Sequence, residues 1–101
     1  MAGNILADPG GGPGVLVVTG ASRGIGAACA CLGALAGYRV MVNFGRSRDA
    51  ALAVVADIEK SGGTVIAVGA DASRLAEVEH LFAKTDRHFG KVTALINNVG
   101  A

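Results

Sequence analysis

A glycine-rich segment constrains this chain more than any other feature of its sequence. It reads Thr-Gly-Ala-Ser-Arg-Gly-Ile-Gly and occupies residues 19–26. The apolar run Val-Leu-Val-Val at 15–18 comes directly before it, and an alanine- and leucine-rich stretch over 25–36 follows. A short, β-branched apolar run is typical of a strand buried on both faces of a parallel sheet. The segment therefore predicts a tight turn that joins a buried strand to a helix.

The glycine spacing in this turn suits a phosphate-binding site. Gly20, Gly24 and Gly26 give the pattern G-x-x-x-G-x-G. Glycines allow positive φ angles and a close approach of the backbone to a phosphate. The start of the helix adds unpaired N–H groups and the positive end of the helix dipole. We expect the turn to bind the pyrophosphate of a nucleotide, with an unliganded glycine turn as the alternative.

Apolar runs and helical patterns alternate along the rest of the chain. The second helix is expected between an N-cap at Ser47 and a stop at Gly62, and the third between a cap at Ser73 and Gly90. Further strands are expected at 38–44, 64–68 and 92–96. The inner face of the second helix is expected to hold Ala51, Val54, Val55 and Ile58. The inner face of the third is expected to hold Leu75, Val78, Leu81, Phe82 and Phe89.

The order βαβαβαβ indicates an α/β protein with a parallel sheet and helices on both of its faces. Right-handed crossovers allow the strand order 3-2-1-4, which ends here after the fourth strand. Ligands bind such sheets where the strand order reverses, outside the carboxyl ends of the strands. The glycine turn follows the first strand and the segment Asn-Asn-Val-Gly at 97–100 follows the fourth. We therefore expect these two distant segments to meet at one crevice.

Three motifs together resemble the short-chain dehydrogenase/reductase family. They are the turn TGASRGIG at 19–26, Asp71 after the third strand and NNVG at 97–100, in the order and at the spacing of that family. The resemblance covers the chain from Val15 to its end. It implies the N-terminal part of a Rossmann-type domain in a dinucleotide-dependent oxidoreductase. The turn and the stretch VNFGRS at 42–47 are most similar to 3-oxoacyl-carrier-protein reductases.

The resemblance also implies a cofactor-binding role for individual residues. Asp71 would accept a hydrogen bond from the adenine amino group, with the backbone of Ala72 beside it. Asn98 and Gly100 would contact the adenosine ribose, and Asn97 would be mainly structural. An ordinary carboxylate at a helix start remains the alternative for Asp71, and a strand-end turn for the asparagines. The turn residues that would line the dinucleotide are Gly20, Ser22, Arg23, Gly24, Ile25 and Gly26.

The residues after the second strand predict NADP(H) rather than NAD(H) as the cofactor. An NAD-selective site places a carboxylate there to bind the ribose 2′-hydroxyl, and here that position holds Phe44. A guanidinium binds a 2′-phosphate instead. Arg46 and Arg23 stand where NADP-preferring members of the family carry such groups. The alternative is that Arg46 is a solvated residue at a helix start.

No catalytic residue is expected within the 101 residues. The family uses a Tyr-x-x-x-Lys motif with an upstream serine to protonate a carbonyl or deprotonate an alcohol. The single tyrosine is Tyr38, and the position four residues later is Val42. The sequence thus favours the cofactor-binding half of an oxidoreductase, whose small carbonyl or alcohol substrate would need residues beyond 101. A non-catalytic nucleotide-binding or interaction module is the alternative. The glycine spacing argues against a third reading, a methyltransferase.

Composition narrows the classes of protein to which this chain can belong. Hydrophobic residues make up 51% of the chain and charged residues 17%, with a net charge of +1, which excludes a disordered tail and gives no support to nucleic-acid binding. No run is long and apolar enough to cross a membrane. We expect residues 1–14 to form a flexible Gly/Pro-rich leader, and 15–101 the nucleotide-binding part. Cys29 and Cys31 would point to different faces of a helix, which suits neither a disulfide between them nor a zinc site, and they indicate a reducing, cytoplasmic compartment. No metal is expected, and the family resemblance suggests a homo-oligomer.

Overall fold

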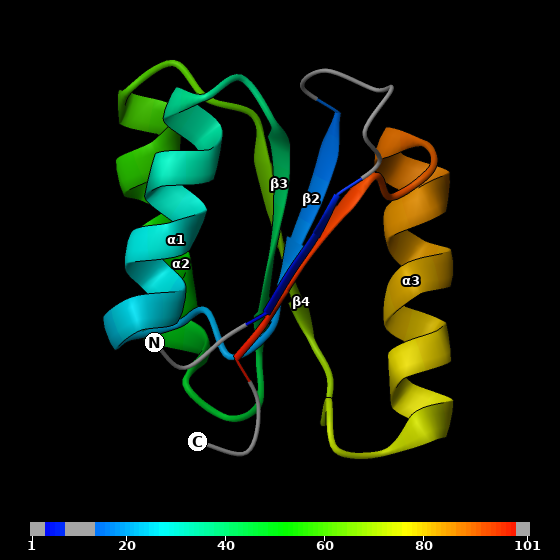
Figure 1. The fold of residues 1–101 in the computed structure, drawn as a ribbon. Coiled ribbons are helices and arrows are strands. Elements are labelled where there is room, and N and C mark those ends of the chain that lie inside the picture. Colours follow the sequence, from blue (N-terminus) through cyan, green and yellow to red (C-terminus); the bar gives the residue numbers. More distant parts are fainter. Residues whose placement is uncertain (1–3, 8–13, 99–101) are drawn as a thin grey trace.

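The structure, a computed structural model, describes residues 4–7 and 14–98. The chain alternates between strands and helices in the way that the apolar runs predicted (Figure 1). The elements in order are β1 (Asn4–Ala7), β2 (Val15–Val18), α1 (Gly24–Leu35), β3 (Arg39–Phe44), α2 (Arg48–Lys60), β4 (Val65–Gly69), α3 (Leu75–Phe89) and β5 (Ala94–Asn97).

The strands form one sheet in the order β1-β5-β2-β3-β4. The four strands β5, β2, β3 and β4 are parallel, and Val18 of β2 pairs with Val42 on one side and with Ile96 on the other. Counted along the sequence from β2, this is the order 3-2-1-4, so the predicted topology is confirmed. The strand order reverses between β2 and β5, and ligands of such sheets bind outside the carboxyl ends of the strands near this point.

The amino-terminal segment differs from our expectation at residues 4–7. These residues form β1, which pairs with β5 in antiparallel register, with Asn4 opposite Asn97 and Ala7 opposite Ala94. The prediction that the leader has no fold of its own is therefore wrong for this stretch. The Gly- and Pro-rich leader contains a short stretch without either residue, Asn-Ile-Leu-Ala. Its backbone pairs with groups of β5 that would otherwise be unpaired at the edge of the sheet. Residues 1–3 and 8–13 lie outside the described residues.

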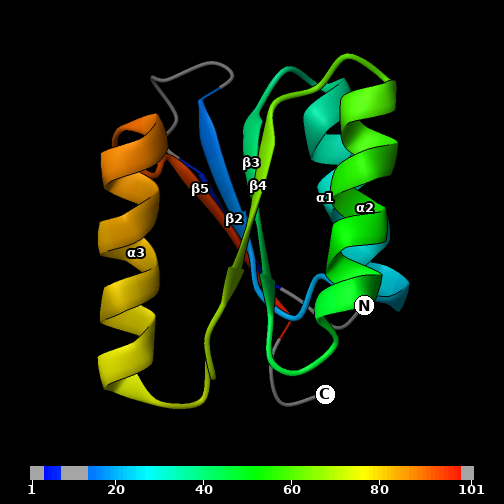
Figure 2. The same ribbon diagram turned by 180° about the vertical axis from the view of Figure 1, so that it is seen from behind.

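Helices cover both faces of the sheet. Figures 1 and 2 show α1 and α2 together on one face and α3 on the other. Successive residues of a strand point to opposite faces. Val40 and Val42 pack under α1 and α2, whereas Met41 packs under α3, and all three side chains are fully buried. The apolar runs are continuous because both faces of these strands are covered.

The predicted inner faces of α2 and α3 are confirmed, but the predictions for Leu75 and Ser73 are wrong. In α2 the predicted residues Ala51, Val54 and Ile58 are buried. In α3 Leu81 is buried, but Leu75 is 75% exposed, because it is the first residue of the helix and precedes the turn that contacts the sheet. Ser73 does not cap α3: the N-cap position is Arg74, and the Ser73 hydroxyl bonds Asp71 instead. Ser47 does occupy the N-cap position of α2, without a side-chain hydrogen bond.

Candidate cofactor-binding site

The carboxyl ends of the four parallel strands meet at one edge of the sheet, at the bottom of Figure 1. The segments that follow β2, β3 and β4 turn there toward the helices, and residues 97–98 reach the same edge from β5. Hydrogen bonds join these segments across the edge: Thr19 N donates to Ile96 O at 3.0 Å, and Ala70 N donates to Phe44 O at 3.0 Å. The sheet therefore brings together the motifs that lie far apart in the sequence.

The turn after β2 needs its three glycines for different physical reasons. Gly20 and Gly24 have φ angles of 59° and 58°, which side chains rarely tolerate. A Cβ at Gly20 would also lie 3.1 Å from the carbonyl oxygen of Asn98, whereas a Cβ at Gly24 would meet nothing within 4 Å. A Cβ at Gly26 would clash with the Gly20 carbonyl oxygen and lie 2.9 Å from Asn98 Nδ2. Gly20 and Gly26 are thus fixed by packing, and the backbone at Gly24 borders open space.

The amino end of α1 is free of the groups that usually satisfy a helix start. Its N-cap residue, Arg23, is extended and makes no side-chain cap, and the first turn holds no acidic residue. By contrast, α2 has Asp49 and α3 has Glu77 in the first turn. The first N–H groups of any helix have no acceptor within the helix, and the dipole makes this end positive. An anion is the ligand that this helix end suits.

The asparagines after β5 are tied to the glycine turn. The Thr19 hydroxyl donates to Asn97 Oδ1 at 3.0 Å and accepts from Asn98 N at 2.8 Å. Asn98 Nδ2 donates to Gly20 O at 3.3 Å, while the buried Asn98 Oδ1 has no hydrogen-bond partner among the described residues. Leaving a buried acceptor unpaired costs about 1–3 kcal/mol, so a donor supplied beside the turn would stabilise this arrangement.

One pocket at this edge gathers predicted residues from three segments. Its volume is about 380 Å³, within the size range of small-ligand sites. It is lined by Gly20, Asn43, Gly45, Arg46, Ala70, Asp71 and Ala72. The glycine turn, the segment after β3 and the segment after β4 thus contribute to a single hollow. Asn43 was not singled out from the sequence, although a polar residue near the end of the apolar run VMVNF was a signal for it.

Several other predicted site residues do not line this pocket. Ser22 is half-buried in the turn, while Arg23 and Ile25 are exposed beside it, and none of the three lines the pocket. The Phe44 ring packs against β4, since a Cβ at Gly69 would lie 3.1 Å from its Cζ atom. Gly100 lies outside the described residues.

Asp71 is held in a local turn before α3. Its Oδ1 accepts hydrogen bonds from the Ser73 hydroxyl and, at 3.0 Å, from Ser73 N, while Asp71 N donates to Glu77 Oε1 at 2.8 Å. The two bonds from Ser73 lower the pKa of the Asp71 carboxyl below its ordinary value of 3.8, and the charges of Arg74 and Arg46 lower it further. Asp71 is therefore an ionised acceptor at neutral pH. Asp71 thus has the role at a helix start that was its alternative interpretation, and it lines the pocket as well.

We expect Ser73→Ala to raise the pKa of Asp71 toward 3.8, because the substitution removes the hydroxyl that lowers it most. The pKa is lower in the folded than in the unfolded chain. The turn therefore stabilises the fold above pH 3.8, and the contribution is lost as the pH falls through the lowered pKa. A ¹³C NMR titration of the carboxyl carbon measures the shift, with the exposed and distant Ser61→Ala as the control. An unchanged Asp71 titration in Ser73→Ala would contradict this account.

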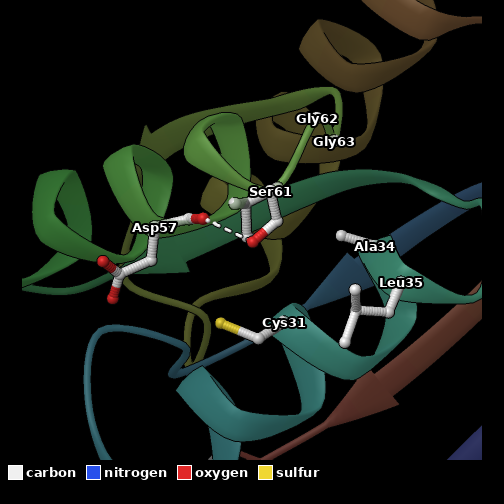
Figure 3. Close-up of a pocket in the computed structure, with 8 residues that line it drawn as sticks. Cys31, Ala34, Leu35, Asp57, Ser61, Gly62 and Gly63 are labelled. Atoms are coloured by element: carbon white, nitrogen blue, oxygen red, sulfur yellow. Dashed lines mark hydrogen bonds between the residues drawn. The ribbon is translucent and has the colours of Figure 1, made fainter.

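A second hollow lies between the carboxyl ends of α1 and α2, at the opposite end of α1 from the glycine turn (Figure 3). It has a volume of about 200 Å³ and is lined by Cys31, Ala34, Leu35, Asp57, Ile58, Ser61, Gly62 and Gly63. The Ser61 hydroxyl donates to the Asp57 carbonyl oxygen at 3.2 Å, so its polar group is already satisfied within α2 and its cap. None of the predicted site residues is among its lining residues.

Two further observations concern only the residues that the structure describes. No group of three or more His, Cys, Asp or Glu side chains there is placed to hold a metal ion. None of the described helices has the length and apolar character needed to span a bilayer.

The fold defines the class of this protein as a Rossmann-type α/β domain: a doubly wound sheet with four parallel strands, and with a glycine turn and an uncapped helix start at its switch point. The family model for short chain dehydrogenase matches residues 14–101, and the chain belongs to that family. The family resemblance of the sequence motifs is thus confirmed. Short-chain dehydrogenases use nicotinamide dinucleotides, and the glycine turn, the bare helix start and the unpaired Asn98 acceptor fit such a ligand.

Individual relatives agree with this assignment. The chain is 46% identical to a 3-oxoacyl-[acyl-carrier-protein] reductase of Synechocystis over 85% of its length, and 47% identical to an L-rhamnose 1-dehydrogenase (NAD(P)(+)) of Azotobacter vinelandii over 84%. A short-chain dehydrogenase/reductase structure from Serratia marcescens superposes with a TM-score of 0.76, at 35% identity, and covers 78% of this chain. The chain spans 35%, 34% and 32% of these three proteins, respectively, or about a third of each.

Proposed function

We propose that this chain forms the NADP(H)-binding part of an oxidoreductase that transfers a hydride between the cofactor and a carbonyl or alcohol. The observation that carries the proposal is the single pocket lined by Gly20, Arg46 and Asp71. These residues supply a backbone that a ligand can approach closely, a cation and an anion, all at the carboxyl ends of β2, β3 and β4. A dinucleotide offers the matching groups, namely phosphates and an adenine amino group.

Each end of the ligand has its own contacts in this proposal. The pyrophosphate lies at the start of α1, where the N–H groups of Gly24, Ile25 and Gly26 have no acceptor within the helix. The Asp71 carboxylate accepts a hydrogen bond from the adenine amino group, with the Ala72 backbone beside it. Asn98 and Gly100 contact the ribose. Ser22 and Arg23 flank the pyrophosphate from the turn.

The preference for NADP(H) rests on Arg46. Its exposed side chain lines the pocket after β3, and no acidic residue occurs between Asn43 and Arg48. A carboxylate there would repel a 2′-phosphate, whereas a guanidinium binds it with two hydrogen bonds. Phe44 packs on β4 and offers the 2′-hydroxyl no acceptor from its side chain.

We expect Arg46→Asp to weaken NADPH binding by about 10–100-fold and to change NADH binding by less than about threefold. The substitution replaces the 2′-phosphate partner by a repelling charge. Equilibrium titration of both cofactors measures the preference. Arg48→Asp is the matched control, because Arg48 is also exposed, begins α2 and does not line the pocket. An intact NADPH preference in Arg46→Asp would overturn the assignment.

The bound cofactor supplies the hydride, and we assign no proton-transfer residue within this sequence. Tyr38 is half-buried and packs against the core cluster under α1 and α2, at the amino end of β3, away from the pocket. Its role is therefore packing.

The free thiols of Cys29 and Cys31 support a reducing, cytoplasmic location. The exposed apolar side chains Leu32 and Leu35 on α1 support a homo-oligomer that would bury them.

A further inference from the structure

Asn43 is a buried polar residue at the carboxyl end of β3, with 1% of its surface exposed. Its side chain bonds the segments on both sides of it. Gly20 N donates to Asn43 Oδ1 at 3.2 Å, and Asn43 Nδ2 donates to Ala70 O at 3.0 Å and to Val68 O at 3.3 Å. One amide thus connects the glycine turn after β2 with the end of β4.

We propose that Asn43 is a positioning residue, which fixes the glycine turn at the distance from the Asp71 segment that one dinucleotide requires. The inference rests on the proposed function, because it assumes that the pyrophosphate and the adenine bind at these two places. Asn43, Gly20 and Ala70 line the same pocket, and Asp71 follows Ala70 directly. A shift of the amide would therefore move the two halves of the pocket relative to one another.

The orientation of the Asn43 amide is determined by its partners. A backbone N–H faces its oxygen, and three backbone carbonyls, including that of Phe44 at 3.5 Å, face its nitrogen, so both ends of the amide are matched. The main chain adds a bond on each side: Ala21 N donates to Asn43 O at 2.8 Å, and Ala70 N donates to Phe44 O at 3.0 Å. Hydrogen bonds in a buried site of low dielectric constant are strong and rigid. Asn43 accordingly holds both segments against β3.

This role predicts a particular pattern of ligand affinities. NADPH must reach both halves of the pocket at once, so its affinity depends on their spacing. Adenosine 2′-phosphate carries the adenine, its ribose and the 2′-phosphate, but no pyrophosphate. In the proposed function it meets Asp71 and Arg46 and does not reach the start of α1. Loss of the Asn43 amide should therefore weaken NADPH binding far more than the binding of adenosine 2′-phosphate.

The first test is Asn43→Leu, which keeps the size of the side chain and removes its hydrogen bonds. We expect NADPH to bind at least about tenfold more weakly and adenosine 2′-phosphate to change by less than about threefold. Val42→Ala is the matched control, since Val42 is the neighbouring residue of β3, is fully buried and does not line the pocket. It should affect both ligands to the same small extent. Isothermal titration calorimetry on the full chain measures both affinities.

The second test, Asn43→Asp, keeps the inference falsifiable if Asn43→Leu does not fold. The new carboxylate still accepts from Gly20 N, but its other oxygen faces the carbonyls of Phe44, Val68 and Ala70. Protonation returns a donor to that side. The NADPH affinity relative to wild type should therefore recover as the pH falls from about 8 to about 5.5, since burial and the three carbonyls raise a carboxyl pKa. Arg46 and Asp71, the charged residues of the pocket, are the same in both proteins, so the ratio cancels their effect.

The outcomes distinguish the inference from the function on which it rests. Equal weakening of both ligands by Asn43→Leu, or unchanged NADPH affinity, overturns the positioning role. A pH-independent affinity ratio for Asn43→Asp overturns it as well. A wild-type chain that binds neither NADPH nor adenosine 2′-phosphate overturns the proposed function itself.

Discussion

Gly26→Ala is expected to abolish dinucleotide binding and to destabilise the fold by about 1–3 kcal/mol, the usual penalty for overpacking. The added methyl group would clash with the Gly20 carbonyl oxygen and approach Ala21 Cα to 3.0 Å. Both are backbone atoms of the glycine turn, so no side-chain rotation relieves the contact. The start of α1 would have to move away from the turn, and the N–H groups offered to the pyrophosphate would move with it. Titration with NADPH and urea unfolding measure the two effects.

Gly33→Ala is the matched control, because Gly33 lies in the same helix. Its added Cβ would meet Leu16 Cδ2, the far end of a side chain that can shift. Replacing glycine by alanine inside a helix also stabilises it by up to about 1 kcal/mol, which offsets the contact. We expect NADPH affinity to stay at the wild-type value. A Gly26→Ala protein that binds NADPH as tightly as wild type would contradict the packing role of this glycine.

The sequence was sufficient for the topology, and four of the predicted site residues, Gly20, Arg46, Asp71 and Ala72, lie in one pocket. The apolar runs at 15–18 and 40–42 are buried on both faces, and that pattern by itself indicates a parallel sheet. The strand order then followed from the handedness of the crossovers. Gly20, Arg46 and Asp71 each follow a strand whose carboxyl end meets the same edge, and the family resemblance implied that one dinucleotide contacts all three. The pocket that they share is the direct consequence of this topology.

What the sequence could not predict depends on register and on competing local contacts. Asn43 bonds Gly20 and Ala70 because β2, β3 and β4 end side by side, and no spacing along the chain reveals that. The bond between Ser73 and Asp71 competes with helix capping, and a short polar side chain can serve either role. Strand β1 needs the free edge of β5, which exists only once the sheet has formed. In each case the deciding partner is distant in sequence or is one of several local choices.

Leu81→Ala is expected to lower the free energy of unfolding by about 2–5 kcal/mol, the cost of removing a large buried side chain and leaving a cavity. Leu81 is fully buried against Val17, Met41 and Val68, and α3 alone covers that face of the sheet among the described helices. A domain has only about 5–15 kcal/mol of stability in total, so this single change removes a large part of it.

Far-UV circular dichroism during urea unfolding measures the loss, since the chain has no tryptophan to serve as a fluorescence probe. The control is Leu75→Ala, which removes the same group from the same helix at a position that is 75% exposed. It should change stability by no more than about 0.5 kcal/mol. The carboxyl end of β4 leads through Asp71 directly into α3, so loosening this helix should also weaken NADPH binding. Equal stability losses for Leu75→Ala and Leu81→Ala would show that α3 does not depend on its buried contact with the sheet.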